Sequence, residues 1–281
     1  MDRSKTKNFI IAVLLLVNIF LLTVVAMDRV ETLSVHREAE KKLIAILNDT
    51  GITIADGVLS SLSPMASRHL VRDMDRELSM MKAALGNDVT GSDKGGNIWF
   101  YDGSYGQAQL NGTGELDITP WAGTIRRSGD LTDTAVNYLK KLGIDSDPGT
   151  AEISGTGEVD SVSLTCNWDG FPVFNCKIIF TFSNESAISV RGFRPLDTNI
   201  SDPGTPALDV GTILMRFLDM LYKDGVACSE IISIKQGYML NVSVSGDGYL
   251  TPYWHIVTDS GEYSVNGLTG IVENIALSSF W

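Results

Sequence analysis

Hydrophobic positions follow two kinds of pattern along the 281 residues of the chain. The first is a predominantly apolar run from Asn8 to Met27 that contains no charged side chain. At the rise of an α-helix, about twenty residues span roughly 30 Å, the thickness of a bilayer's hydrocarbon core. The second kind is periodic and occupies the rest of the chain. The apolar run therefore predicts one transmembrane helix, and the periodic part predicts a folded domain.

Basic residues at the amino terminus set the predicted orientation of this helix. Residues 1–7 contain Arg3, Lys5 and Lys7, and the positive-inside rule places such a tail in the cytoplasm. No second run of this length follows, so the rest of the chain is expected to be extracytoplasmic on a single-pass anchor in the cell membrane. A cleaved secretory signal is the alternative, because small residues around Ala26 offer a cleavage site.

Helical spacing of apolar residues predicts four helices after the membrane segment. Glycine stands just beyond several of them, and glycine is the residue type that most often follows a helix end. The fourth helix begins with proline, which suits a first helical turn. The predicted helices cover residues 30–47, 67–85, 131–142 and 206–222.

Alternating apolar and polar residues predict antiparallel strands between these helices. The clearest pair is Ser161–Trp168 with Phe174–Phe182. Helix followed by meander, repeated along the chain, predicts an α+β fold in which each helix covers one face of a sheet. The predicted organisation is membrane-proximal helices with a short sheet in 28–125, a first helix-plus-sheet unit in 126–200 and a second in 205–281. The other expected strands cover 97–101, 105–110, 115–118, 187–191, 231–234, 238–244, 253–258, 262–266 and 271–275.

The clearest predicted hairpin brings two cysteines together. Its two apolar faces can both be buried only if Trp168 lies opposite Phe174, because a slip by one residue would turn one face to water. That register places Cys166 opposite Cys176, and directly opposed Cβ atoms lie near the range that a disulfide needs. A disulfide and two buried free thiols both fit this arrangement. The third cysteine, Cys228, has no evident partner.

Charge and motif content argue against several classes of protein. The formal net charge of -12 is the opposite of what a nucleic-acid binder needs to displace counterions from phosphates. The histidines His36, His69 and His255 have no neighbouring carboxylate or cysteine at the spacing of a metal site. Nucleophile-elbow, zinc-protease and phosphate-binding glycine motifs do not occur. The chain is therefore expected to be no enzyme and to use no cofactor or metal.

Three segments resemble the YycI proteins. Residues 1–7 followed at once by one apolar helix are similar to the start of that family, although Arg3 stands where an aromatic residue is expected. Pro252–Asn266, closed by Thr269-Gly270, resembles the last hairpin of the family with its P-x-W and G-E-Y-x-V-N pattern. Gly170–Phe174 resembles a turn-and-strand element of YycI and of its relative YycH.

The resemblance implies a regulator that acts without catalysis. YycI and YycH are membrane-anchored accessory proteins of the YycG/WalK two-component system in Gram-positive bacteria. They act by contact with its sensor histidine kinase. The implied partners are therefore the lipid bilayer, a sensor histidine kinase and a YycH-like protein. A cell-surface PepSY-like binding or inhibitory module for peptide or cell-wall glycan is the competing interpretation, and a hydrolase is the third.

Two polar residues of the predicted membrane helix are candidates for contact with a partner helix. Asn18 is strongly polar and lies in mid-span, and Thr23 follows further along the same helix. Within a bilayer, apolar surfaces attract one another little, and a polar side chain between helices contributes about 1 kcal/mol. Hydrogen bonding of Asn18 to its own backbone is the alternative.

Overall fold

The computed structural model describes residues 41–55, 57–59, 62–156, 158–199, 204–243 and 246–274. The predicted membrane segment Asn8–Met27, with Asn18 and Thr23, lies outside these residues. None of the helices in the described part is long and apolar enough to cross a membrane. The fold is α+β, with few helices and a large mixed sheet. This sheet has two parts, named here the first sheet and the second sheet.

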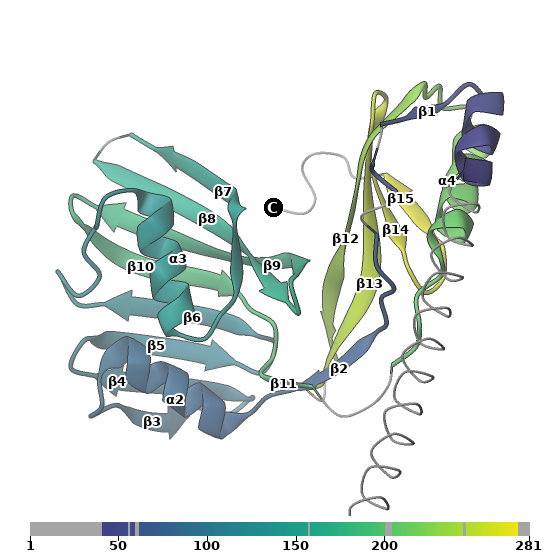
Figure 1. Ribbon diagram of the computed structural model, residues 1–281. Helices are drawn as coiled ribbons and strands as arrows, with labels where there is room; N and C mark the ends of the chain where they lie inside the picture. The colour runs from purple at the N-terminus through teal and green to yellow at the C-terminus, as the bar shows by residue number, and fades with distance from the viewer. Residues whose placement is uncertain are drawn as a thin grey trace, which may run out of the picture.

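The first sheet is antiparallel and carries two helices on one face (Figure 1). The helices are α2 (Met74–Leu85) and α3 (Leu131–Lys141). Between them and the strands lies an apolar core, in which Tyr138 meets Phe180 edge to face at 5.8 Å. The strands, in spatial order, are β7 (Ser146–Gly155), β8 (Val159–Trp168), β9 (Phe171–Ser183), β10 (Ser186–Phe193), β6 (Glu115–Pro120), β5 (Gly106–Asn111), β4 (Ile98–Gly103) and β3 (Thr90–Asp93).

The second sheet is smaller and packs against α4 (Val210–Asp224) and a helix over residues 41–49 (Figure 1). Phe217 of α4 meets Tyr263 of the sheet at 5.1 Å between ring centroids. The strands run in the order β11 (Thr198–Asn199), β2 (Arg68–Val71), β13 (Gly248–Thr258) and β12 (Glu230–Val242). Beside this series, β14 (Gly261–Asn266) and β15 (Val272–Asn274) extend from β13, and β1 (Thr53–Ile54) pairs with β12.

A short parallel contact joins the two sheets. Tyr238 of β12 lies beside Val173 of β9. The amide side chain of Asn175 then donates to the carbonyl of Leu240 at 2.7 Å and accepts from its backbone nitrogen at 2.8 Å. A Cβ at Gly237 would lie 2.6 Å from the Phe174 ring, so the close approach of the strands depends on glycine at this position. From this junction the sheets diverge (Figure 1).

Several helix boundaries differ from the prediction. Helix α3 agrees with it closely, but the helix expected over residues 67–85 is divided into strand β2 and helix α2. The division falls at Asp73, whose carboxylate accepts hydrogen bonds from the first backbone nitrogens of α2. The helix expected from Pro206 begins at Val210, because Asp209 caps it by accepting from Thr212 N at 2.9 Å.

The tip of the β8–β9 hairpin has a different register from the predicted one. Trp168 lies opposite Phe171, where the prediction placed Phe174. The cause is the turn Asp169-Gly170, in which both residues have positive φ, 50° and 79°. Such an Asp-Gly pair closes a tight two-residue turn and lengthens β9 by three residues beyond the expected start. The register then shifts just after Thr165, which restores the buried alternation further along the hairpin.

The two cysteines of this hairpin are buried free thiols in the structure. The Cys166 thiol donates to the carbonyl of Phe193 at 3.6 Å. Burial raises the pKa of Cys166 to about 12, and burial raises the pKa of Cys176 well above its ordinary value. Because the thiolate is the form that attacks in disulfide exchange, both buried thiols are expected to react slowly.

Candidate functional site

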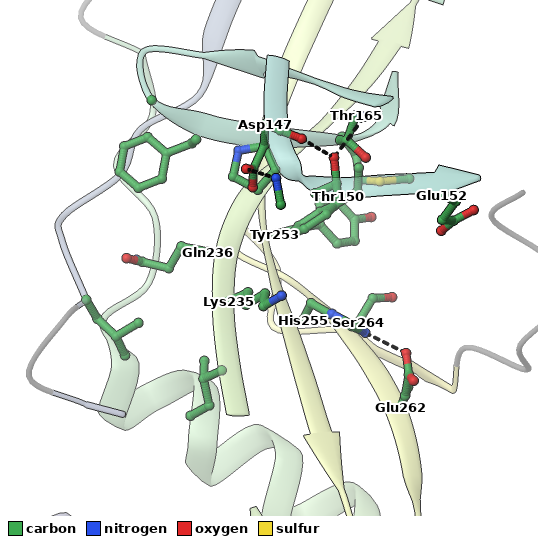
Figure 2. Close-up of a pocket in the computed structure, with 18 residues that line it drawn as sticks. Asp147, Thr150, Glu152, Thr165, Lys235, Gln236, Tyr253, His255, Glu262 and Ser264 are labelled. Atoms are coloured by element: carbon green, nitrogen blue, oxygen red, sulfur yellow. Dashed lines mark hydrogen bonds and ion pairs between the residues drawn. The ribbon is translucent and has the colours of Figure 1, made fainter. Parts of the chain in front are cut away.

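A cleft of about 500 Å³ opens where the two sheets diverge (Figure 2). One wall consists of β7, β8 and the beginning of β9, and the other of β12, β13 and β14. The tip of the β8–β9 hairpin forms the end of the cleft nearest the junction, with Phe171 and Phe174 among its lining residues. The cleft is therefore a product of the fold as a whole, since no single helix-plus-sheet unit could form both walls.

The first wall is a bent stretch of the edge strand β7. Its pairing with β8 shifts between Asp147 and Glu152, so the intervening residues leave the regular ladder. Three hydrogen bonds hold this bend. The Asp147 carboxylate accepts from Gly149 N at 2.8 Å, the Asp147 carbonyl accepts from Thr150 Oγ1 at 2.7 Å, and Thr150 Oγ1 accepts from Thr165 N at 3.0 Å. The bend fixes Asp147 on the rim of the cleft.

The second wall takes its polar side chains from neighbouring strands. In the strand register, Lys235 of β12 lies opposite His255 of β13, which in turn lies opposite Ser264 of β14. His255 Nε2 is 2.9 Å from a carboxylate oxygen of Glu262, and its ring contacts Phe174 across the junction at 6.0 Å between centroids. The exposed ammonium of Lys235 forms no ion pair with any residue that the structure describes.

Ser264 differs from the other polar residues of the cleft. Its side chain lines the cleft but is only 5% exposed. Within the described ranges, its Oγ has no hydrogen-bond partner. A buried polar group without a partner costs about 1–3 kcal/mol. The hydroxyl therefore marks a point at which a bound molecule could supply the missing hydrogen bond.

The first wall carries negative charge, and the second carries both signs. Asp147 and Glu152 lie on the first wall, and Lys235 and Glu262 lie on the second (Figure 2). Glu152 is paired with Lys177 at 3.2 Å and Glu262 is bonded to His255 at 2.9 Å, so Asp147 and Lys235 are the charges most available to a ligand.

A hydrolytic triad can use the residue types of Ser264, His255 and Glu262, but these side chains are not connected as in such a triad. Glu262 is bonded to Nε2 of His255, and no hydrogen bond joins Ser264 to His255 among the residues described. Nucleophilic catalysis requires a base within hydrogen-bond reach of the nucleophile. Among all the residues that the structure describes, no group of three or more His, Cys, Asp or Glu side chains could hold a metal ion.

A second polar cluster lies where the chain crosses between the sheets, and it is named here the crossing network. It consists of Arg72, Glu77, Arg194 and Asp197. Glu77 is fully buried. Arg72 donates to both of its carboxylate oxygens at 2.7 Å, and Arg194 pairs with Asp197 at 2.6 Å. Tyr101 also donates to Glu77, and burial followed by this hydrogen bond raises the pKa of Tyr101.

The sequence-predicted site residues meet different outcomes. Asn18 and Thr23 stay predictions, because they lie outside the described residues. His255 and His69 have no carboxylate at the sequence spacing of a metal site, but each lies near one in space: His255 has Glu262 at 2.9 Å, and His69 has Asp247 at 3.8 Å. Glu262 lies on β14, the neighbour of β13, and Asp247 directly precedes β13, which pairs with β2.

Comparisons with known proteins give only distant likenesses. No known protein family matches the sequence, and no curated protein matches it. Among solved structures, an uncharacterized protein from Eubacterium rectale is 13% identical, with a TM-score of 0.48 over 80% of this chain and 90% of that one. The C-terminal domain of Bacillus megaterium YpeB is 10% identical, with a TM-score of 0.35 over 73% of this chain and 98% of that one.

YycH from Bacillus subtilis is also among these structures. It is 12% identical, with a TM-score of 0.35 over 70% of this chain and 52% of that one. The chain thus corresponds to about half of YycH. Likenesses of this strength do not decide membership of the YycI family and assign no function.

Proposed function

We propose that the protein is a membrane-anchored extracytoplasmic regulator that modulates a two-component sensor histidine kinase by protein contact. The apolar run Asn8–Met27 supports the anchor, and the basic residues before it support the extracytoplasmic position of the domain. The resemblance of residues 1–7, 170–174 and 252–266 to YycI supports the regulatory role.

One structural observation carries the proposal furthest. Two of the segments that resemble YycI are far apart in the sequence, yet they meet at the junction of the sheets. Phe174 from the first segment contacts His255 from the second at 6.0 Å between ring centroids. Phe174 also covers Gly237, the position that allows the strands to approach closely. Two of the three segments that resemble YycI thus meet where the two sheets are joined.

The membrane helix provides the direct test. A photo-crosslinking residue in place of Leu22, one helical turn beyond Asn18, should capture a sensor kinase when the full chain is in native membranes. Asn18→Leu should lower co-purification of that kinase about fivefold, since an interhelical Asn contributes about 1 kcal/mol. Val17→Leu, which exchanges one apolar residue for another beside it, is the matched control and should leave the yield unchanged.

Two results would overturn this proposal. One is the absence of any kinase from the crosslinked material. The other is a mature amino terminus just after Ala26 on protein released from the cells, which would show a cleaved signal in place of an anchor.

A peptide-binding surface module is the second candidate function. The unpartnered hydroxyl of Ser264 in the cleft favours it, because a protein that acted only through its membrane helix would not need an open polar cleft.

A further inference from the structure

The cleft between the sheets has the features of a ligand site. It is concave, its volume of about 500 Å³ lies within the usual range of about 300–1,000 Å³ for ligand pockets, and it combines apolar and polar lining. Its polar groups converge from separate strands of both sheets. Ser264 Oγ is the decisive one, because it is buried, faces the cleft and lacks a hydrogen-bond partner in the described chain.

The distribution of charge indicates what kind of molecule would fit. Asp147 on one wall favours a cationic group, and Lys235 on the other favours an anionic group (Figure 2). The lining also includes the half-buried aromatic rings of Phe174 and Tyr253. A ligand that matches these features has a positive end, an apolar part and a negative end.

We propose that the cleft binds a short extended peptide. Its amino group lies at Asp147, its carboxylate lies at Lys235, and its backbone forms a hydrogen bond with Ser264 Oγ. An apolar side chain of the peptide contacts the aromatic surface. The volume accommodates about three residues, since pockets of this size enclose small ligands.

A neutral glycan fits the cleft less well. Its hydroxyl groups could bond Ser264, but Asp147 and Lys235 would lose water without gaining an opposite charge. Burying charges without partners is costly.

This inference rests on the second candidate function, peptide binding, and does not depend on the proposed kinase contact. A peptide-binding site in the extracytoplasmic domain would allow a contact regulator to respond to a peptide ligand. Peptide binding and kinase capture are separate measurements, so either proposal can fail while the other stands.

The test measures binding of three probes to the full chain in detergent micelles by isothermal titration calorimetry. The probes are the tripeptide Ala-Phe-Ala with free ends, its N-acetylated form and its C-amidated form. The free tripeptide should bind with a Kd below about 1 mM, the strength expected for a ligand of this size. Each capped form should bind about tenfold more weakly, because each lacks one charge-assisted contact.

Variants assign each end of the peptide to a wall. Asp147→Asn should abolish the preference for a free amino group, and Lys235→Met should abolish the preference for a free carboxylate. Ser264→Ala should weaken the binding of all three probes about equally, by about fivefold, since it removes one neutral hydrogen bond. Asp102→Asn on β4 and Lys223→Met on α4 are matched controls outside the cleft and should leave binding unchanged.

Three results would overturn the proposal. The first is no heat of binding with any peptide at several millimolar. The second is equal affinity for free and capped peptides, which would remove the roles of Asp147 and Lys235. The third is displacement of the tripeptide by a neutral chitin tetrasaccharide of higher affinity, which would assign the cleft to glycan. Urea unfolding of each variant identifies any loss of binding that follows from loss of the fold.

Discussion

The two polar regions between the sheets are built in opposite ways. In the crossing network, both oxygens of the buried Glu77 accept hydrogen bonds, and Arg194 binds Asp197, although Arg194 Nε has no partner in the described chain. In the cleft, Ser264 has no partner and Lys235 forms no ion pair among the residues described. Both regions lie between the sheets, but the crossing network pairs its charges internally and the cleft leaves polar groups without partners in the described residues.

This difference distinguishes polar groups that stabilise the fold from polar groups that are available to bind a ligand. Charges that neutralise one another inside the protein hold the crossing strands in place, and removing one leaves the other uncompensated. Polar groups that face an open cleft contribute little to the fold, because water or a ligand must complete them. The crossing network should therefore control stability, and the cleft should control binding.

The largest expected effect is at Glu77. Glu77→Gln removes the negative charge between Arg72 and Arg194, and breaking a buried pair costs about 3–5 kcal/mol. The free energy of unfolding from urea titration measures this loss. The matched control is Asp117→Asn, which breaks the pair with Arg191 at 3.0 Å, where the side chains are 40% and 63% exposed. The control should cost less than about 1 kcal/mol, and equal losses would contradict the assignment.

A smaller loss of stability is expected when the capping residue of α4 is removed, and the start of α3 provides the comparison. Asp209 caps α4 with a hydrogen bond from Thr212 N at 2.9 Å, whereas Asp130 precedes α3 without a side-chain capping bond. Asp209→Ala should lower the free energy of unfolding by about 1 kcal/mol. Asp130→Ala should cost clearly less. If the two losses were equal, the capping bond would not be the cause.

The cap at Asp209 also predicts a pH dependence. Hydrogen bonding by Thr212 N lowers the pKa of Asp209 below its ordinary value of 3.8. The ionised form is therefore favoured by folding, so its stabilisation is complete above about pH 4–5 and is lost as pH falls through the lowered pKa. The difference in unfolding free energy between the native chain and Asp209→Ala should shrink on acidification. A difference that stayed constant down to pH 2 would contradict this role.

The smallest effect on stability is expected in the cleft. Ser264→Ala removes a hydroxyl that has no partner in the described residues, so no hydrogen bond is lost. The free energy of unfolding should change by less than about 0.5 kcal/mol or rise slightly, because a costly unpaired group disappears. A loss above about 1.5 kcal/mol would show that Ser264 belongs to the core and not to a binding surface.

Local patterns predicted much of the fold but not its edges. Strand β8 and helix α3 were found because buried positions repeat with the period of their structure. Strand β7 has no such pattern, since it is an edge strand whose sequence contains proline and glycine and whose pairing is interrupted. Strand β2 was assigned to a helix because its apolar Leu70 continues the helical spacing of α2. Asp73 was the available signal for the boundary.

The cleft could not be predicted from local patterns. Asp147 and Lys235 come from strands of different sheets, and their approach depends on the contact between β9 and β12. The proximity of His255 to Glu262 follows from the β13–β14 hairpin, which the sequence predicts. The register of that hairpin therefore indicates this pair. The missing partner of Ser264 is a property of the packed structure alone.

The most direct test is amide hydrogen exchange of the full chain with and without saturating Ala-Phe-Ala. It asks whether the cleft binds the peptide while the crossing network only stabilises the fold. Peptide should slow exchange in residues 147–152, 233–239 and 262–264, which form the two walls, and leave residues 72–77 and 194–197 of the crossing network unchanged. Unchanged exchange in the walls, or equal slowing in both regions, would contradict the distinction between them.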